Sequence, residues 1–534
     1  MNQRRLCVLA MFFLLTAQLP AAPRPQKNSV KAPASFACSP EEIAGRMQGS
    51  NPAPMVIPTL QRWTGGNGTT RLSSQSRIVL EPRNAKALEP LGKLLASELK
   101  GMTGLSLPVA AASIIAPGDI ALSLSPCGAQ TRTSIGSEGN TLLLRNAIVV
   151  RANTSRGAFY GTRTLLQLLM LAGTSSARSQ PSVPQGFSID SPRYATRSVM
   201  LDAGRMFLSP KLLEDTMRFM SWYKLNTLHL HLNDQADAID ASGHLNYPFV
   251  VKAFRLKSDQ AKFANLIPAD GKAYTRRDWD QMEEVAARYG IDIVPEIDTP
   301  GHAAAFTRAR PDLQLVTGNT HDTSILDVRK PETLSYIESV FAEFLPWFHS
   351  RQIHIGGDEV SGIPVADQVR YLNALNRYLR SKGKTVSIWG AEAEPEFAGG
   401  LDKNITVQWW SGAKNDWSEA GFRNINSPFS MYLLPKPGDR SAPHSLSGEA
   451  VYTKWEASIN QQHPPSGGQI CVWNDWAVMG YPESYVQDLI QDAIPAAAQM
   501  FWTGYAKDAA GAVIPYAVLE KSVNVLQHGP APLF

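Results

Sequence analysis

The sequence predicts an α/β protein in which a (β/α)8 TIM barrel follows a small α+β accessory domain. After Pro192 the pattern changes to strand-then-helix repetition, which is typical of a parallel sheet or barrel. Eight such units follow in about 310 residues, and a barrel needs roughly 250 before insertions. The chain has 534 residues, 44% hydrophobic and 18% charged, so it can form a large core and more than one domain.

Composition divides the chain into five segments. The N-terminus has two arginines, an almost unbroken apolar run from Leu6 to Leu19 and then Pro-Ala-Ala, which is the pattern of a signal peptide. We therefore expect an exported protein, periplasmic or extracellular. No cysteine directly follows that run and no later stretch is apolar for long enough to cross a bilayer, so no membrane anchor is expected. The expected segments are a signal peptide (1–22), a linker (23–54), the accessory domain (55–190), the barrel (191–510) and a C-terminal tail (511–534).

Three cysteines lie outside the predicted signal peptide. Cys471 belongs to an apolar run and is expected to be a buried thiol. We hypothesise that Cys38 and Cys127 form a disulfide, as export permits. Three cysteines without paired spacing do not indicate a metal site.

Short apolar runs and helical periodicity predict the elements. In the accessory domain they indicate strands Arg77–Leu80, Leu142–Leu144 and Ile148–Val150, with helices Ala85–Lys100 and Gly157–Leu171. The expected barrel strands are Ser198–Asp202, Asn226–Asp234, Ile291–Asp298, Gln352–Asp358, Thr385–Trp389, Ile405–Trp410, Ser430–Leu434 and Gln469–Asp475. The expected barrel helices are Ser209–Lys224 (N-cap Ser209), Arg277–Tyr289, Thr333–His349, Val365–Lys382 and Tyr485–Trp502. Gln235–Ala273 has little periodicity and is expected to be an inserted loop near the site.

Polar and aromatic side chains gather at the carboxyl ends of these strands, where parallel α/β proteins place their active sites. Asp358 and Glu359, behind Gly356-Gly357, are the leading candidates for acid/base chemistry. The full set is Asp202, Arg205, His231, Asp234, Glu296, Asp298, His302, Asp358, Glu359, Trp389, Trp410, Tyr432, Trp473 and Asp475. It contains no Lys nucleophile, phosphate loop or G-x-S-x-G elbow. Aromatic faces among carboxylates suit a sugar, and the absence of a Lys/Arg run argues against nucleic acid.

Two other functions fit part of this pattern. His229-Leu-His231 is an H-x-H on a strand, as in metal-dependent amidohydrolase barrels, which need further histidines on later strands. Here the later strands offer only His354, on the wrong side of its Gly-Gly, so we expect no metal and no cofactor. A sugar-binding protein without activity would keep the aromatics but would not need the acid pair.

Several motifs resemble one enzyme family. His354-Ile-Gly-Gly-Asp-Glu359 resembles the H-x-G-G-D-E signature of glycoside hydrolase family 20, the β-N-acetylhexosaminidases. Further stretches resemble its other motifs in order, from about residue 55 to 505. They are Gly157–Gln167, Arg197–Phe207, Lys224–Gln235 and Val294–His302.

The resemblance implies exo-acting hydrolysis of terminal N-acetyl-β-hexosamines, with the substrate's own acetamido oxygen as nucleophile. Glu359 would be the general acid and base, with a raised pKa, and Asp358 would orient the acetamido group. The other implied roles are acetamido contact (Tyr432), a proton relay (Asp234, His302), sugar-hydroxyl binding (Arg197, Asp475) and an aromatic box (Trp389, Trp410, Trp473), with Trp409 in the core.

The sequence departs from the family at two positions. Many members have an acid where Leu434 stands, and a glutamate where the shorter Asp475 stands. Recognition of O4 and O6 is therefore open, with N-acetylglucosamine favoured. A lacto-N-biosidase, which releases a disaccharide, is the alternative, and Arg197 argues against it. The expected partner is an oligosaccharide or glycoconjugate with a terminal N-acetylhexosamine, and the oligomeric state is left open.

Overall fold

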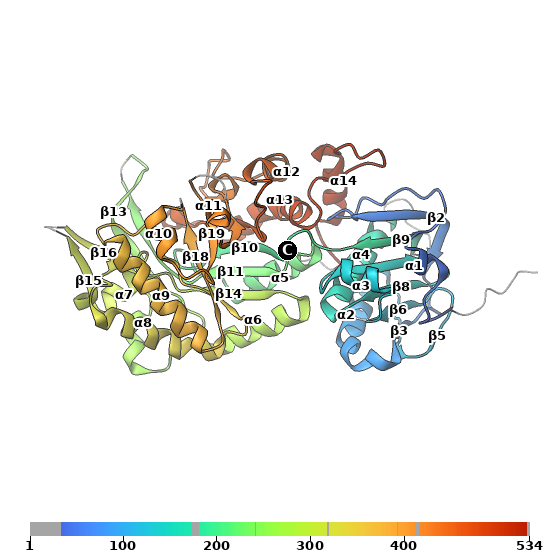
Figure 1. The fold of residues 1–534 in the computed structure, drawn as a ribbon, viewed down its shortest axis with the longest axis horizontal. Coiled ribbons are helices and arrows are strands. Elements are labelled where there is room, and N and C mark those ends of the chain that lie inside the picture. Colours follow the sequence, from blue (N-terminus) through green and yellow to red (C-terminus); the bar gives the residue numbers. More distant parts are fainter. Residues whose placement is uncertain are drawn as a thin grey trace, which may run out of the picture.

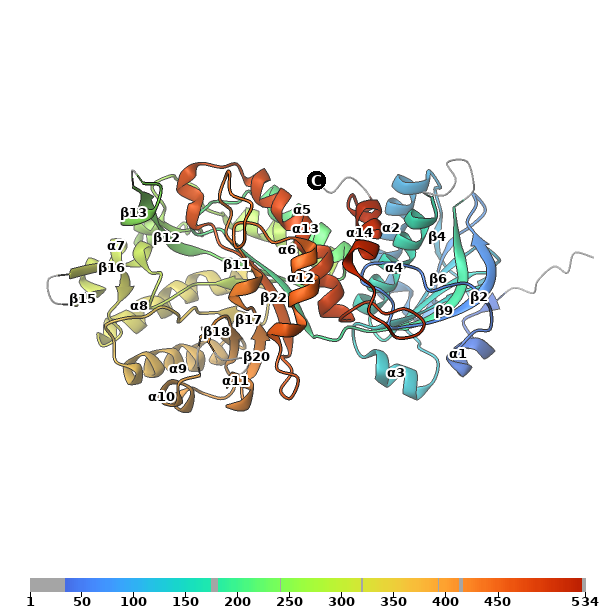
Figure 2. The ribbon, with the colours of Figure 1, turned by 90° about the horizontal axis from the view of Figure 1, so that it is seen from above.

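The computed structural model describes residues 34–173, 181–240, 242–317, 320–391, 393–412 and 416–530. The predicted signal peptide lies outside these residues. Figures 1 and 2 show two bodies, an N-terminal domain and a larger barrel, lying end to end. Within the described ranges no helix is both long and apolar enough to span a membrane.

The accessory domain is a seven-stranded sheet whose order is β2-β9-β7-β8-β6-β3-β4. Its two long helices, α2 (Ala85–Thr103) and α4 (Ser155–Gly173), contact each other, and both predicted helices are confirmed. Helix α4 is buried along most of its length because it packs between this sheet and the rest of the protein. The strands are β2 (Arg62–Arg71), β3 (Ile78–Leu80), β4 (Val109–Ala111), β6 (Ile120–Ser123), β7 (Asn140–Leu144), β8 (Ile148–Ala152) and β9 (Ser182–Asp190).

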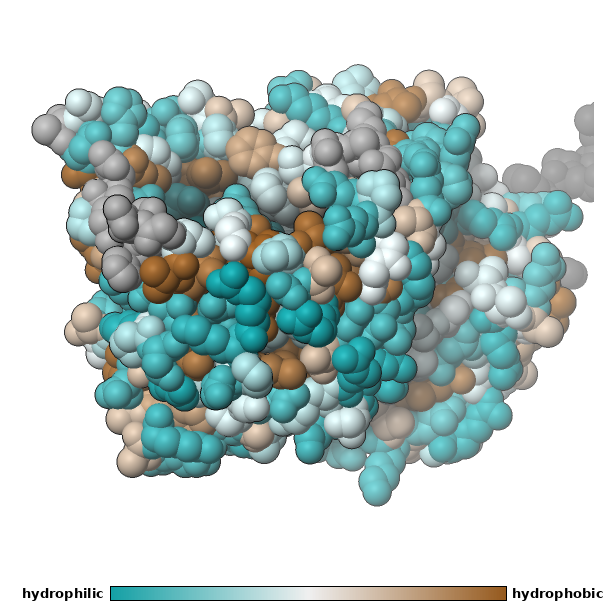
Figure 3. Space-filling model, turned by 60° about the vertical axis from the view of Figure 1, so that its left-hand side comes forward, coloured by the Kyte–Doolittle hydropathy of each residue, from teal (hydrophilic) through white to brown (hydrophobic). Residues whose placement is uncertain are grey.

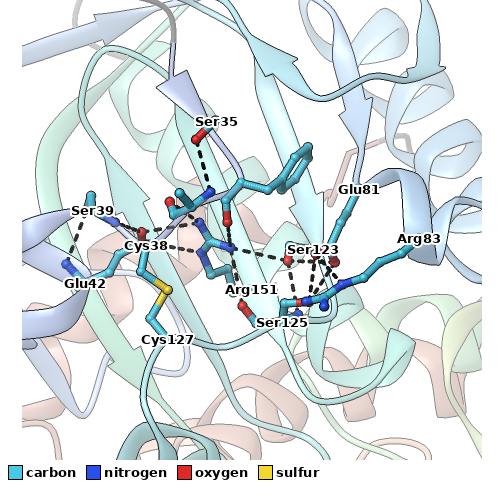
Figure 4. The surroundings of a disulfide bond; sticks show 12 residues. Ser35, Cys38, Ser39, Glu42, Glu81, Arg83, Ser123, Ser125, Cys127 and Arg151 are labelled. Carbon is cyan, nitrogen blue, oxygen red and sulfur yellow. Dashed lines mark hydrogen bonds and ion pairs between the residues drawn. A yellow bond between two sulfur atoms is a disulfide. The ribbon is translucent and has the colours of Figure 1, made fainter.

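A disulfide and a buried ion pair attach the N-terminal segment to this domain (Figure 4). Cys38 is bonded to Cys127, which confirms the hypothesised bridge, and Cys471 is a buried free thiol as predicted. Arg151 Nε donates to Glu42 Oε1 at 2.5 Å, and both side chains are buried. The part of the predicted linker that the structure describes therefore packs on the domain, through β1 (Ala34–Ser35), which pairs with β5 (Ile114–Ile115), and α1 (Pro40–Ala44).

Eight parallel strands close into a barrel, which confirms the predicted fold. The last strand, β22, pairs with the first, β10, as well as with β20. The barrel strands are β10 (Thr196–Asp202), β11 (Thr227–His231), β14 (Asp292–Glu296), β17 (Gln352–His354), β18 (Thr385–Gly390), β19 (Thr406–Trp409), β20 (Arg423–Asn426) and β22 (Gly467–Val472). The longer helices around it are α5 (Pro210–Trp222), α6 (Arg276–Tyr289), α8 (Pro331–Phe344), α9 (Val365–Ser381) and α13 (Glu483–Trp502). Ser209 accepts a hydrogen bond from Leu212 N–H, as an N-cap should.

Two sequence predictions about the barrel are wrong. The seventh strand does not start at Ser430: β20 begins at Arg423, and after an interruption β21 (Tyr432–Leu433) pairs with the end of β22. The segment Gln235–Ala273 is not a plain loop, because β12 (Asn233–Ile239) and β13 (Leu245–Phe254) form an antiparallel hairpin there. A second hairpin, β15 (Gln314–Thr317) and β16 (Thr320–Leu326), was not predicted at all.

The segment predicted as a C-terminal tail contains a packed helix, α14 (Tyr516–Leu526). It contacts α4 of the accessory domain and α12 (Gly448–Lys454) of the barrel. Trp222 Nε1 donates to Leu526 O at 2.9 Å, and Leu526 is buried. The C-terminal segment therefore helps to join the two domains.

Candidate active site

Asp358 and Glu359 lie in the loop after β17, at the carboxyl end of the barrel. Gly356 has φ +71°, and a Cβ atom there would lie 1.5 Å from Asp298 Oδ1, so only glycine fits. Gly357 N–H donates to the same oxygen at 3.1 Å. Glu359 itself has φ +51°, which is unusual for a residue with a side chain. This loop buries the side chain of Asp358, which is 13% exposed, and leaves that of Glu359 61% exposed.

A chain of close polar contacts connects Glu359 to the barrel interior. Glu359 Oε2 lies 3.5 Å from His302 Nε2, and His302 Nδ1 lies 3.0 Å from Asp234 Oδ1. Asp234 Oδ2 lies 2.7 Å from His231 Nε2, and His231 Nδ1 lies 2.7 Å from Glu296 Oε2. Carboxylates and imidazoles alternate along this chain. The structure thus brings together Asp234, His302 and Glu359, which the sequence predicts to act together.

The acidic and basic groups of the site have strongly shifted pKa values. Burial raises the pKa of Asp358 to about 6, and the nearby carboxylates of Glu296 and Glu359 add to this effect. Burial would lower the pKa of His302, but Asp234 and other carboxylates raise it well above its ordinary value. Burial likewise opposes ionisation of Asp234, yet Arg205 and His302 hold the pKa of Asp234 below its ordinary value. The site therefore holds a histidine cation beside the two leading carboxyl groups.

The expected rise in the pKa of Glu359 is not observed. The hydrogen bond from His302 lowers the pKa of Glu359, and burial, which would raise it, is the smaller effect. The physical reason is exposure: water still solvates this carboxylate, while its nearest charged neighbour is the cationic His302. Proximity to Asp358 and aromatic rings, on which the expectation rested, does not outweigh these two effects.

The pocket in front of these carboxyl groups is open to solvent and has a volume of about 130 Å³. Figure 3 turns this end of the barrel forward and shows apolar side chains gathered beside a hollow with hydrophilic ones around them. The lining residues are Arg205, His302, Asp358, Glu359, Trp410, Phe429, Tyr432, Leu434, Trp473 and Asp475.

Three of the four predicted aromatic residues, Trp410, Tyr432 and Trp473, line the pocket itself. The fourth, Trp389, lies behind it, with its ring 5.5 Å from that of Trp473 and its Nε1 donating to Glu296 at 2.5 Å. Phe429 was missed by the sequence prediction, although it is 51% exposed at the pocket and 5.4 Å from the Tyr432 ring. An apolar residue in the short loop just before Tyr432 was the signal that could have identified it.

Arg197 does not lie in the pocket, and its predicted role as a sugar-binding residue is wrong. It is the second residue of β10, at the opposite end of the barrel, and it is fully buried. Its guanidinium donates to Glu138 of the accessory domain at 2.7 Å and to Lys224 O at 2.8 Å. Arg197 therefore joins the two domains.

Arg205, three residues after β10, is the arginine that lines the pocket. Its Nη1 lies 2.7 Å from Asp234 and 3.0 Å from Asp202, and its Nε donates to Gln235 O. Its Nη2 makes no hydrogen bond within the described ranges and lies 3.9 Å from Asp475 Oδ1. The position of Arg205 after the strand end was the signal that should have selected it over Arg197.

Both positions at which the sequence departs from the family line the pocket. Asp475 lies near Arg205, and burial raises its pKa, although Arg205 partly opposes this. Leu434 is adjacent to β21 and contributes an apolar surface. The pocket wall therefore combines one acid with one aliphatic side chain at these positions.

The buried histidines also form a group with metal-ligand geometry, and the expectation that His354 lies apart from the H-x-H pair is wrong. The rings of His229 and His354 are 4.7 Å apart, because both approach Glu296 at 3.0 Å. The nitrogen and oxygen atoms of these three residues lie close enough to hold a cation. Glu296 also accepts from His231 and Trp389, so its oxygens already have protein donors.

Comparisons with known proteins agree with the fold. The model described as "Glycosyl hydrolase family 20, catalytic domain" matches residues 194–368, and "Glycosyl hydrolase family 20, domain 2" matches residues 53–187. A solved structure of Streptomyces plicatus N-acetyl-β-hexosaminidase in complex with thio-NAglucal is 24% identical, with a TM-score of 0.70, covering 91% of this chain and 97% of that one.

Curated relatives are similar over much of the chain. A lacto-N-biosidase of Bifidobacterium bifidum is 25% identical over 84% of this chain and 40% of its own length. A β-hexosaminidase of Porphyromonas gingivalis is 26% identical over 85% of this chain and 61% of its own length. The β subunit of Sus scrofa β-hexosaminidase is 30% identical over 61% of this chain and 63% of its own length. The chain thus spans between 40% and 63% of the length of these relatives. The two family models, which follow each other along the accessory domain and the barrel, show that this chain belongs to glycoside hydrolase family 20.

Proposed function

We propose that this protein is an exo-acting β-N-acetylhexosaminidase that removes terminal non-reducing N-acetyl-β-hexosamines, with N-acetylglucosamine favoured. The main support is the difference between two adjacent carboxyl groups at the pocket: the side chain of Asp358 is only 13% exposed, whereas that of Glu359 is 61% exposed. Asp358 Oδ1 has no hydrogen-bond partner in the described part of the chain, so it is free to accept one from a ligand. An acetamido N–H is a donor that suits this oxygen.

The reaction we propose uses the substrate as its own nucleophile. The acetamido carbonyl oxygen attacks C1 while the bond from C1 to the leaving oxygen breaks, and the Glu359 carboxyl group gives its proton to that oxygen. The resulting oxazolinium ion carries positive charge, which the Asp358 carboxylate stabilises. Water then attacks C1 and Glu359 accepts its proton, while the bond from C1 to the oxazolinium ring oxygen breaks and restores the acetamido group. Two inversions at C1 leave its configuration retained. Positioning a nucleophile within the substrate can contribute up to about 7–11 kcal/mol in ideal geometry.

Glu359 must carry a proton when the leaving oxygen departs, although its pKa is lowered in the open pocket. A bound sugar covers Glu359 and removes water from it, which raises its pKa. Asp358 must be ionised to accept from the acetamido N–H, and its pKa of about 6 permits this near neutral pH. His302 and Asp234 would support the movement of this proton through their contact with Glu359.

Exo action is supported by Arg205, whose free Nη2 and neighbour Asp475 provide a donor and an acceptor for hydroxyls of a terminal sugar. Leu434 provides no hydroxyl partner. One observation favours a second candidate, the release of a disaccharide: the B. bifidum relative is a lacto-N-biosidase. The charged Arg205 at the pocket favours a sugar with free hydroxyls over an extended one.

Paired aryl β-glycosides test this proposal. We expect hydrolysis of N-acetylglucosaminide to exceed that of N-acetylgalactosaminide and of lacto-N-bioside. Glu359→Gln should lower kcat by several orders of magnitude, roughly 10³-fold or more, without unfolding the protein. A thiazoline mimic of the intermediate should inhibit strongly. Normal turnover by Glu359→Gln, or no inhibition by the thiazoline, would refute the mechanism, while faster release of lacto-N-biose would favour the second candidate.

We also propose that the protein acts outside the cytoplasm. The signal-like N-terminus supports this, and so does the disulfide between Cys38 and Cys127, because oxidising compartments favour such bonds. Recovery of the mature chain from the periplasm or medium would test it, and retention of the intact chain in the cytosol would contradict it.

A further inference from the structure

A second cavity shares the Asp358–Glu359 loop with the first pocket, and the mechanism above gives this cavity no role. Its volume is about 500 Å³, against about 130 Å³ for the first pocket. Its wall is formed by that loop and by the chain around α9, α10 (Pro395–Gly400) and α11 (Asp416–Glu419). These three helices lie close to β18 in both ribbon views (Figures 1 and 2).

The two cavities share Asp358, Glu359 and Trp410. The general acid must touch the oxygen that joins the terminal sugar to the rest of the glycan. If the terminal sugar fills the first pocket, the sugar on the far side of that oxygen passes Glu359 and enters the second cavity. We propose that the second cavity binds the leaving portion of the substrate, an inference that rests on the proposed hydrolase function.

Several side chains of the second cavity suit a saccharide. Phe397 and Trp410 present aromatic surface, which suits the C–H faces of sugar rings. Trp410 Nε1 is buried and has no hydrogen-bond partner in the described part of the chain. Gln368 Nε2 donates to Ile363 O at 2.8 Å and so braces the loop after Glu359. These features give the cavity a fixed wall with a free donor.

The charge of the cavity selects among leaving groups. Asp358, Glu359 and Glu394 line it, and its described lining includes no lysine, arginine or histidine. Glu394 is exposed and forms no ion pair within the described ranges. An anionic sugar would meet the negative charge of Glu394 there. The cavity therefore accepts neutral or amine-bearing sugars and disfavours uronic acids and other acidic sugars.

Four substrates with the same terminal N-acetylglucosamine test this inference. Three are β-1,4-disaccharides whose second sugar is N-acetylglucosamine, glucosamine or glucuronic acid, and the fourth is the methyl glycoside, whose leaving group is too small to fill the cavity. We expect kcat/KM for the glucuronic acid disaccharide to be about tenfold or more below that for the other two disaccharides, and the deficit to shrink in high salt.

Glu394→Gln is the decisive variant, and Glu396→Gln is its matched control. Both residues are exposed at α10, but only Glu394 lines the cavity. Glu394→Gln should reduce the glucuronic acid deficit by about threefold, whereas Glu396→Gln should not, and neither should change the methyl glycoside. Equal rates for acidic and neutral disaccharides, or equal effects of the two variants, would overturn the inference. Failure to cleave even the methyl and aryl glycosides would instead refute the proposed function on which it rests.

Discussion

Arg197→Lys and Arg205→Lys each replace a guanidinium group by an ammonium, one near the start of β10 and one just after its end. We expect the first to lower stability and the second to lower catalysis. Arg197 Nε donates to Lys224 O at 2.8 Å, while its Nη1 donates to Tyr194 O at 2.8 Å and to Glu138 at 2.7 Å. A lysine ammonium at this place keeps the charge but cannot reach all three acceptors. If the ammonium keeps one acceptor, two are left unpaired at about 1–3 kcal/mol each, so the free energy of unfolding should fall by about 2–6 kcal/mol. The kcat/KM of the folded enzyme should not change.

Arg205→Lys should act mainly on catalysis. It keeps a positive charge beside Asp202 and Asp234 but removes the free Nη2 donors that line the pocket. Hydrogen bonds from a charged group are worth about 1.5–3 kcal/mol, so kcat/KM should fall about ten- to a hundredfold. Thermal unfolding by circular dichroism and initial rates on an aryl N-acetylglucosaminide, well below the melting temperature, measure both effects. The reasoning is refuted if Arg197→Lys loses activity at unchanged stability, or if Arg205→Lys keeps full kcat/KM.

Three further predictions concern stability. The pKa of Asp358 is raised to about 6 in the folded protein, so its ionisation opposes folding above pH 6, and this penalty disappears as the pH falls toward 4. At pH 7.5 the free energy of unfolding of Asp358→Asn should therefore exceed that of the parent by up to about 3 kcal/mol, which raises its unfolding temperature, whereas at pH 4 the two should be alike. The same difference at both pH values would contradict this. The Cys38–Cys127 bond spans 89 residues of sequence, and its loss should lower the free energy of unfolding by about 2–5 kcal/mol, whether by reduction or by replacing both cysteines with serine. Unchanged denaturant midpoints would rule this out. Four ring nitrogens lie within 3.0 Å of the Glu296 carboxylate, so Glu296→Gln removes a buried charge that they surround and should cost about 3–5 kcal/mol; an unaltered urea transition would disprove this.

The fold was predictable where local pattern and tertiary packing agree. Four of the eight barrel strands, β10, β11, β14 and β17, end in an ionisable residue, so their carboxyl ends and the Asp358–Glu359 pair could be located from sequence. Strand β20, Arg-Asn-Ile-Asn, has a single apolar residue and depends on pairing with its neighbours and on contacts such as that of Asn426 with Ser458. The β12–β13 hairpin contains a β-bulge, which breaks the alternation that would have revealed it. Such elements exist because of contacts distant in sequence.

The site shows the same limit. The chemistry of the carboxylates followed from residue types and position, whereas the choice between Arg197 and Arg205 required knowing which end of β10 each occupies. The sign of the Glu359 pKa shift required the exposed fraction of its side chain and the 3.5 Å approach of His302. Neither quantity is written in a single sequence, because both depend on how separate strands and loops meet.

The opposite pKa shifts of Asp358 and Glu359 connect the two cavities. In the open protein the less exposed group, Asp358, holds its proton up to about pH 6, while Glu359 is ionised beside His302. The proposed reaction needs the reverse arrangement of protons. A terminal sugar in the first pocket supplies an N–H to Asp358 and so favours its carboxylate, and a leaving sugar in the second cavity covers Glu359 and favours its acid form. On this view the substrate itself, by filling both cavities, sets the protonation state in which it reacts.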